Sequence, residues 1–184
     1  MTEAPPRVVR TARLVLRPFE PADEPAYAAI RSQPAVARFL AGGEAGAAEG
    51  AEKAAALVPA FAALWDEVGY GPWAAVEAAT GRLIGHLGLR RVAEFQDRTE
   101  VLYALDPTAQ GRGYAVEGAR AALRYAFDVL DLPEVVAFAR PENLASLKVM
   151  ERIGMARRPG LIEVFGVQAV LCVLTSTEFR KETA

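Results

Sequence analysis

A loop with two glycines, residues 110–115, has the composition of an anion-binding site. It reads Gln-Gly-Arg-Gly-Tyr-Ala, and apolar residues recur behind it at helical spacing as far as residue 130. The residues in front of it, 100–105, are mostly strand-forming types, and Asp106-Pro107 ends that strand because proline has no N–H for the ladder. A helix that begins directly after such a loop presents unpaired N–H groups and the positive end of its dipole. Because Gly111 and Gly113 let a bulky phosphate approach the backbone, we expect a pyrophosphate-binding loop.

The spacing of this loop excludes the two most familiar phosphate-binding motifs. A Walker loop needs a Gly-Lys pair, and the chain contains none. A dinucleotide fingerprint needs a third glycine at the position where this sequence has Val116. The sequence therefore favours a different diphosphate ligand.

Three segments resemble the GNAT superfamily of N-acetyltransferases. Gln110, Gly113 and Ala115 are similar to its acyl-CoA-binding pattern, Q/R-x-x-G-x-G/A. Residues 143–155 resemble its helix pattern, N-x-x-[AS]-x-x-x-x-E-[KR]-x-G-[FM]. Residues 11–19, Thr-Ala-Arg-Leu-Val-Leu-Arg-Pro-Phe, look like the first strand of the branch that contains the ribosomal-protein N-terminal acetyltransferases RimJ and RimL. The segments follow one another in the family's order.

The resemblance implies an α/β (α+β) GNAT fold, with a mixed, mostly antiparallel sheet of about seven strands flanked by helices. Two central strands, here residues 100–105 and 135–139, would splay apart so that the pantetheine arm of acetyl-CoA pairs with one strand edge. A backbone N–H near Leu105 would then polarise the thioester oxygen, as oxyanion-hole donors do. Asn143 would hydrogen-bond acetyl-CoA near the pantetheine. The expected acetyl-CoA-binding residues are Tyr103, Ala104, Leu105, Gln110, Gly111, Arg112, Gly113, Tyr114, Ala115, Asn143 and Ser146.

The resemblance is less complete at the positions that handle protons. Met150 stands where the family often has a tyrosine general acid, and Phe138 stands where some members have a base. We therefore expect Ser146 to be the acid, by its motif position, and Glu100 to be the base, directly or through a water. Both assignments have a structural alternative. The Ser146 hydroxyl is equally expected as a helix cap or solvated group, and Glu100 as a surface carboxylate paired with Arg98 or another cation.

Other candidate side chains have structural interpretations. The chain has one histidine, His86, which is too few for a histidine-based zinc site and makes a Ser/His triad a weak hypothesis. We interpret His86 as structural and expect no metal. Tyr103 is expected to pack in the core, unless its hydroxyl reaches the thioester. If Glu100 is the base, an α-amino group with a pKa of about 8 is an easier acceptor than a lysine at about 10.4.

Length and composition bound the class of protein. At 184 residues the chain suits one domain, and 52% hydrophobic residues favour a well-buried core. We expect a flexible arm over residues 1–10 and a single N-acetyltransferase domain over residues 11–184. The balance of 21 basic and 23 acidic residues argues against nucleic acid as a partner, and no apolar run is long enough to suggest a membrane span. A lone cysteine and the lack of a signal-peptide pattern favour the cytoplasm, and we expect a monomer or a homodimer.

The remaining pattern alternates strands and helices. A strand at 13–19 and a hairpin of 72–78 and 82–91 precede the central strand, and Gly85 and Gly88 suggest close backbone neighbours. Helices are expected at 21–31, 34–40, 51–68 and 115–130, with a flexible link at 41–50. A helix ending at Gly154 and a final hairpin of 161–164 and 167–174 complete the domain.

Two classes of function fit these observations. The first is an acetyl-CoA-dependent N-acetyltransferase, which transfers acetyl to a primary amine by direct attack in a ternary complex. The amine would be a protein N-terminal α-amine or a small-molecule amine. The second is a non-catalytic acyl-CoA-binding or regulatory module, suggested by Met150 and Phe138. A transferase that uses another acyl-CoA would differ only in its pocket.

Overall fold

A single mixed sheet organises the chain. The computed structural model describes residues 5–40 and 43–183, and in this part nine strands join in the order β1-β2-β3-β4-β5-β6-β9-β7, with β8 paired beside β9. Neighbouring strands are antiparallel except β5 and β6, which are parallel. The strands are β1 (Val9–Arg10), β2 (Leu14–Arg17), β3 (Pro72–Glu77), β4 (Leu83–Val92), β5 (Arg98–Leu105), β6 (Glu134–Ala139), β7 (Ala156–Arg157), β8 (Ile162–Val164) and β9 (Val167–Thr175). The expected α/β fold is confirmed.

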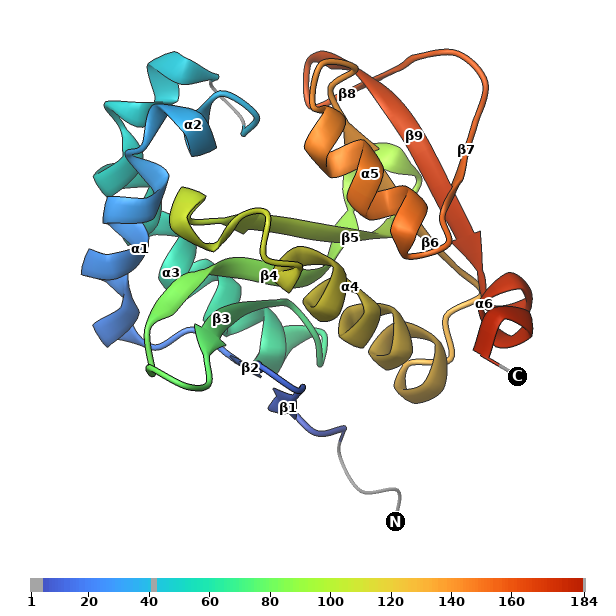
Figure 1. Ribbon diagram of the computed structural model, residues 1–184, viewed down its shortest axis with the longest axis horizontal. Helices are drawn as coiled ribbons and strands as arrows, with labels where there is room; N and C mark the ends of the chain where they lie inside the picture. Colours follow the sequence, from blue (N-terminus) through green and yellow to red (C-terminus); the bar gives the residue numbers. More distant parts are fainter. Residues whose placement is uncertain (1–4, 41–42, 184) are drawn as a thin grey trace.

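Helices cover both faces of the sheet (Figure 1). They are α1 (Glu24–Arg31), α2 (Pro34–Ala37), α3 (Gly50–Glu67), α4 (Tyr114–Arg124), α5 (Leu144–Arg152) and α6 (Ser176–Thr183). On one face, apolar residues of α4 pack with Leu87, Val101 and Leu105, and α5 contacts α4. On the other face, residues of α1 and α3 belong to a second cluster, against which Ala104 packs. Alternate residues of β5 therefore point to different helix layers.

The two central strands diverge. β4 and β5 pair along their whole length, from Gly85 opposite Leu105 to Val92 opposite Arg98. β5 and β6 pair only at Glu100 and Val136. Beyond that pair, the edge of β5 up to Leu105 has no strand beside it in the described part of the chain. The splay expected from the sequence is thus confirmed.

Two glycines of β4 allow the sheet to pack closely. A Cβ atom built on Gly85 would lie 2.1 Å from the carbonyl oxygen of Ala104, and one on Gly88 would lie 2.8 Å from that of Gly71. Both glycines also have positive φ angles, 139° and 153°. The close backbone neighbours expected at these positions are confirmed.

The ends and links of the chain differ from the expected pattern. Of the arm expected over residues 1–10, residues 1–4 lie outside the described residues, whereas Val9 and Arg10 already form β1 and the Arg7 carbonyl accepts a hydrogen bond from Trp73. Of the link expected at 41–50, residues 41–42 are not described, and Glu44–Ala47 forms a 3-10 turn. The helix expected over 115–130 is α4 followed by a π-helical turn, Tyr125–Val129. Among the described residues, no helix is both long and apolar enough to cross a membrane.

Candidate active site

The glycine-bearing loop leads directly into α4. Gly113 is the N-cap residue of this helix and has a φ angle of 83°, while Gly111 has a φ angle of 71°. This left-handed backbone suits glycine. The first N–H groups of the helix lack intrahelical acceptors, as in any α-helix. The Gln110 side chain holds the start of the loop, because its amide donates to the carbonyl oxygen of Leu105 at 2.9 Å. The loop is therefore ordered and has the geometry of an anion-binding site.

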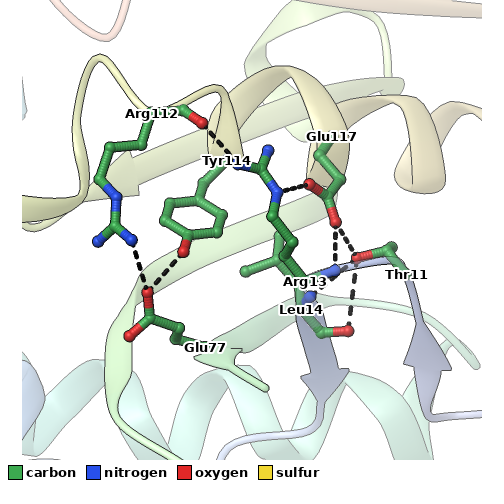
Figure 2. Close-up of polar contacts among 7 residues, drawn as sticks. All are labelled: Thr11, Arg13, Leu14, Glu77, Arg112, Tyr114 and Glu117. Carbon is green, nitrogen blue, oxygen red and sulfur yellow. Dashed lines mark hydrogen bonds and ion pairs between the residues drawn. The ribbon is translucent and has the colours of Figure 1, made fainter. Parts of the chain in front are cut away.

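The residues just before β2 hold this loop in place (Figure 2). The Arg13 guanidinium donates to the Arg112 carbonyl oxygen at 2.8 Å and to the Glu117 carboxylate on α4 at 2.7 Å. Burial tends to raise the pKa of Glu117, but hydrogen bonds from Thr11 and Arg13 outweigh it and hold that pKa below its usual value. The Arg13 guanidinium also lies 4.6 Å from the centre of the Tyr114 ring. The segment that resembles the GNAT first strand thus holds the loop in place through hydrogen bonds.

A second anchor ties the loop to the last residue of β3. The buried hydroxyl of Tyr114 donates to Glu77 at 2.5 Å, and the Arg112 guanidinium lies 3.2 Å from the same carboxylate (Figure 2). These two side chains therefore fix the loop in place. Ligand binding by their backbone N–H groups stays a prediction.

A cavity of about 700 Å³ extends from this loop along the open edge of β5. Among the site residues expected from the sequence, only Arg112 is absent from its walls. The others meet there: Glu100, Tyr103, Ala104, Leu105, Gln110, Gly111, Gly113, Tyr114, Ala115, Asn143 and Ser146. Because the cavity opens where β5 and β6 diverge, it is lined by residues from both faces of the sheet.

On the α4 and α5 face, Tyr103 and Ser146 form a hydrogen-bonded pair. The Tyr103 hydroxyl lies 3.0 Å from Ser146 Oγ and 3.1 Å from the Ser146 carbonyl oxygen. Burial raises the pKa of Tyr103, so this phenol stays protonated. Asn143 caps α5, since its side-chain oxygen accepts from the Ser146 N–H at 3.1 Å. The cap is therefore Asn143, and the Ser146 hydroxyl reaches the cavity beside buried Met150.

On the opposite face, Glu100 is buried and paired. Its side chain is 7% exposed and lies 2.5 Å from the Arg90 guanidinium. Burial raises the pKa of Glu100, and the charge and hydrogen bonds of Arg90 oppose that shift only in part. The alternative of a carboxylate paired with Arg98 or another cation is confirmed in the pairing, which is with Arg90. It is wrong in placing Glu100 at the surface and in naming Arg98, which pairs with Glu134 at 2.8 Å. A buried carboxylate with a raised pKa is a better proton acceptor than an exposed one.

Three residues on this face of the sheet were not predicted to be functional. His86 is 4% exposed, lines the cavity, and has its Nδ1 atom 2.9 Å from the Tyr27 hydroxyl. Burial, followed by the charges of Arg31 and Arg90, lowers the pKa of His86 to about 3, so its ring is neutral. Tyr27 and Arg31 lie one turn apart on α1, and Arg31 also lines the cavity. The only sequence signal for these residues is the four-residue spacing of Tyr27 and Arg31, which is common in any amphipathic helix and does not indicate a site.

Comparison with known proteins agrees with this geometry. Residues 13–156 match the family model described as acetyltransferase (GNAT) domain. The uncharacterized N-acetyltransferase YnaD of Bacillus subtilis is 40% identical over 76 residues, which is 41% of this chain and 44% of that protein. The chain therefore aligns with less than half the length of this curated relative.

Solved structures are similar over nearly the whole chain. A spermidine N-acetyltransferase from Vibrio cholerae in complex with CoA and spermine has a TM-score of 0.72 and 18% identity, covering 91% of this chain and 98% of that one. The ribosomal L7/L12 α-N-protein acetyltransferase RimL in complex with coenzyme A has a TM-score of 0.73 and 18% identity, covering 91% and 97%. At this identity the likeness concerns the fold alone. With the family model matching most of the sequence, the chain belongs to the acetyltransferase (GNAT) domain family.

Proposed function

We propose that the protein is an acetyl-CoA-dependent N-acetyltransferase that acetylates a primary amine by direct attack in a ternary complex. The observation that carries this proposal is the cavity beside the open edge of β5, which is continuous with the glycine-bearing loop at the start of α4. Membership of the GNAT family supports it, as do the two similar folds that hold CoA. Acetyl-CoA, when bound, supplies the thioester that the amine attacks.

The open edge of β5 offers the backbone groups that a pantetheine arm needs. The Asp106 N–H donates to the Ile84 carbonyl oxygen on β4, and N–H groups alternate in direction along a strand. The N–H groups of Tyr103 and Leu105 therefore point toward the splay. Leu105 N–H is a suitable donor to a thioester oxygen, and one such donor is typically worth about 3–4 kcal/mol in the transition state.

The two proton-handling candidates lie on opposite faces of the sheet and meet at the splay. Glu100 would accept the proton of the amine from the α1 and α3 face, where burial raises its pKa. The Tyr103 hydroxyl donates to the Ser146 carbonyl oxygen, so its own oxygen accepts the Ser146 Oγ proton, which Ser146 would release to the leaving thiolate. A base and an acid on either side of the thioester suit direct transfer, since neither needs to move between steps.

A specific observation also favours a non-catalytic acyl-CoA-binding module. Glu100 is already neutralised by Arg90, and Met150, which cannot donate a proton, is buried at the usual acid position. A transferase that uses another acyl-CoA also remains a candidate, because the same residues would serve it.

Transfer of a labelled acetyl group tests the proposal. Labelled acetyl-CoA is offered with peptides that have free N-termini, amino acids, polyamines and aminoglycosides. We expect acetylated product from at least one class, with slower turnover in Ser146→Ala and Glu100→Gln. Tight CoA binding without any transfer would instead favour the non-catalytic module.

A further inference from the structure

A buried guanidinium without a carboxylate partner lines the cavity on the face of the sheet covered by α1 and α3, opposite the face that carries α4. Arg31 is 8% exposed, and its Nη1 atom donates to the Tyr27 hydroxyl at 3.3 Å. Its Nε atom is buried and has no hydrogen-bond partner among the described residues. No ion pair joins Arg31 to a carboxylate in that part of the chain. Burying a cation is costly unless it is paired, so an anionic ligand would complete this site.

The neighbouring hydrogen bonds turn a second donor toward the cavity. A guanidinium can only donate, so the Tyr27 oxygen accepts from Arg31 and its own proton goes to His86 Nδ1. Because the ring of His86 is neutral, its remaining proton is on Nε2. His86 Nε2 has no protein partner among the described residues, and His86 lines the cavity. Arg31 and His86 thus both present donors.

The charges around Arg31 are unbalanced toward positive. Among the described residues that line the cavity, Glu100 is the only carboxylate, and Arg90 already pairs with it. Arg31, which is buried, and Arg38, which is exposed, line the cavity as well. Leu57 and Phe61 form apolar walls, which lower the local dielectric and strengthen each charge interaction.

We infer that the acceptor is a small primary amine that carries an anionic group, a carboxylate or a phosphate, which Arg31 and His86 bind while the amine points to the splay of β5 and β6. This inference rests on the proposed acetyl transfer. His86 pairs with Ala104 on β5, one residue before Leu105, so the anion site lies beside the expected thioester position. A polyamine would instead bring further positive charge next to Arg31 and Arg90, and like charges repel strongly in an apolar cavity.

Matched acceptor pairs test the inference. The pairs are L-phenylalanine with L-phenylalaninamide and O-phosphoethanolamine with ethanolamine, and spermidine represents the polycations. We expect at least about tenfold higher kcat/KM for the anionic member of a pair, since charge-assisted hydrogen bonds to a guanidinium are strong ones. Whichever pair shows the larger ratio identifies carboxylate or phosphate as the preferred anion.

An arginine variant assigns the preference to its site. Arg31→Gln should bring the ratio within a pair close to one, mainly by raising KM for the anionic member. Arg124→Gln removes the same charge from an exposed position on α4 outside the cavity and should leave the ratio unchanged. A preference for spermidine or for the members without an anionic group overturns the inference, as does a ratio that Arg31→Gln does not alter.

A binding measurement separates this inference from the proposed function. Calorimetry compares N-acetyl-L-phenylalanine and N-acetyl-L-phenylalaninamide, and N-acetylated O-phosphoethanolamine and ethanolamine, on the wild-type protein in the presence of CoA. Tighter binding of the anionic products supports the anion site even when no amine is acetylated. The absence of acetylation would then count only against the proposed function. Equal affinity within both pairs removes the anion site, whether or not transfer occurs. Because the wild-type protein is used, the result does not depend on the folding of a variant.

Discussion

The glycine-bearing loop allows a matched pair of substitutions, Gly113→Ala and Gly111→Ala. Both glycines have left-handed φ angles, 83° and 71°. A Cβ atom on Gly111 would have nothing within 4 Å, whereas one on Gly113 would lie 3.3 Å from Arg13 Nη2. The two variants therefore share the backbone strain, and only Gly113→Ala also disturbs the arginine that clamps the loop.

The expected losses follow from these contacts. Holding alanine in a left-handed conformation costs about 1–2 kcal/mol, and this applies to both variants. Displacing Arg13 weakens its bonds to Arg112 and Glu117, and the loss of this half-exposed set adds about 1 kcal/mol. We therefore expect total losses of about 1–2 kcal/mol for Gly111→Ala and about 2–3 kcal/mol for Gly113→Ala. Expressed wholly in CoA affinity, these losses are about 5–30-fold and 30–150-fold.

Calorimetry with CoA and denaturant unfolding must be read together. If the loop relaxes when no ligand is bound, the strain weakens binding; if the fold holds the loop in place, the strain lowers the free energy of unfolding. Gly69→Ala is the control, because Gly69 has a φ angle of 80° and open space around it but lies outside the loop. It should lower stability by a similar amount without changing CoA affinity. Unchanged stability and unchanged CoA affinity in Gly113→Ala would refute the loop assignment.

Three further predictions concern catalysis, charge and packing. Ser146→Ala should lower kcat roughly 100-fold with little change in KM for acetyl-CoA, and steady-state kinetics showing only a KM effect would contradict an acid role. Arg90→Gln should lower the free energy of unfolding by about 3 kcal/mol at pH 8. That loss should shrink as the pH falls through the raised pKa of Glu100, because protonation removes the unpaired buried charge; denaturant unfolding at pH 5 and 8 checks this, and a pH-independent loss counts against it. Gly118→Ala places a Cβ atom 2.2 Å from Leu87 Cδ2, so we expect about 1–3 kcal/mol of destabilisation by overpacking, and an unchanged thermal midpoint would disprove the tight contact.

Much of the fold could be predicted because its elements carry their own local signals. The strand, glycine-bearing loop and helix around residue 113 follow from residue types and apolar spacing alone. The π-helical turn Tyr125–Val129 could not be predicted, since the apolar pattern continues through it without a break. Strands of two residues, such as β1 and β7, are too short for any alternation to appear.

The candidate site also has a part that the sequence predicts and a part that it does not. Gln110, Gly113 and Asn143 lie on motifs, so the sequence predicted that they share one site, and all three line the cavity. The partner of Glu100 could not be predicted, because it depends on the register of β4 against β5, which places Arg90 directly opposite. A register shift of one residue reverses every side chain, and the turn between these strands gives no sequence signal strong enough to set it.

The alternation along β5 explains why the site needs residues from such distant parts of the chain. Tyr103 points to the α4 and α5 face, where Ser146 lies, whereas Glu100 and Ala104 point to the face covered by α1 and α3. In a sheet closed by pairing, these two sets would be separated by the backbone. Because β6 pairs with β5 only at Glu100 and Val136, the two faces share one cavity beyond that point. The motif-bearing face can thus hold the acyl donor while α1, which carries no motif, determines the acceptor.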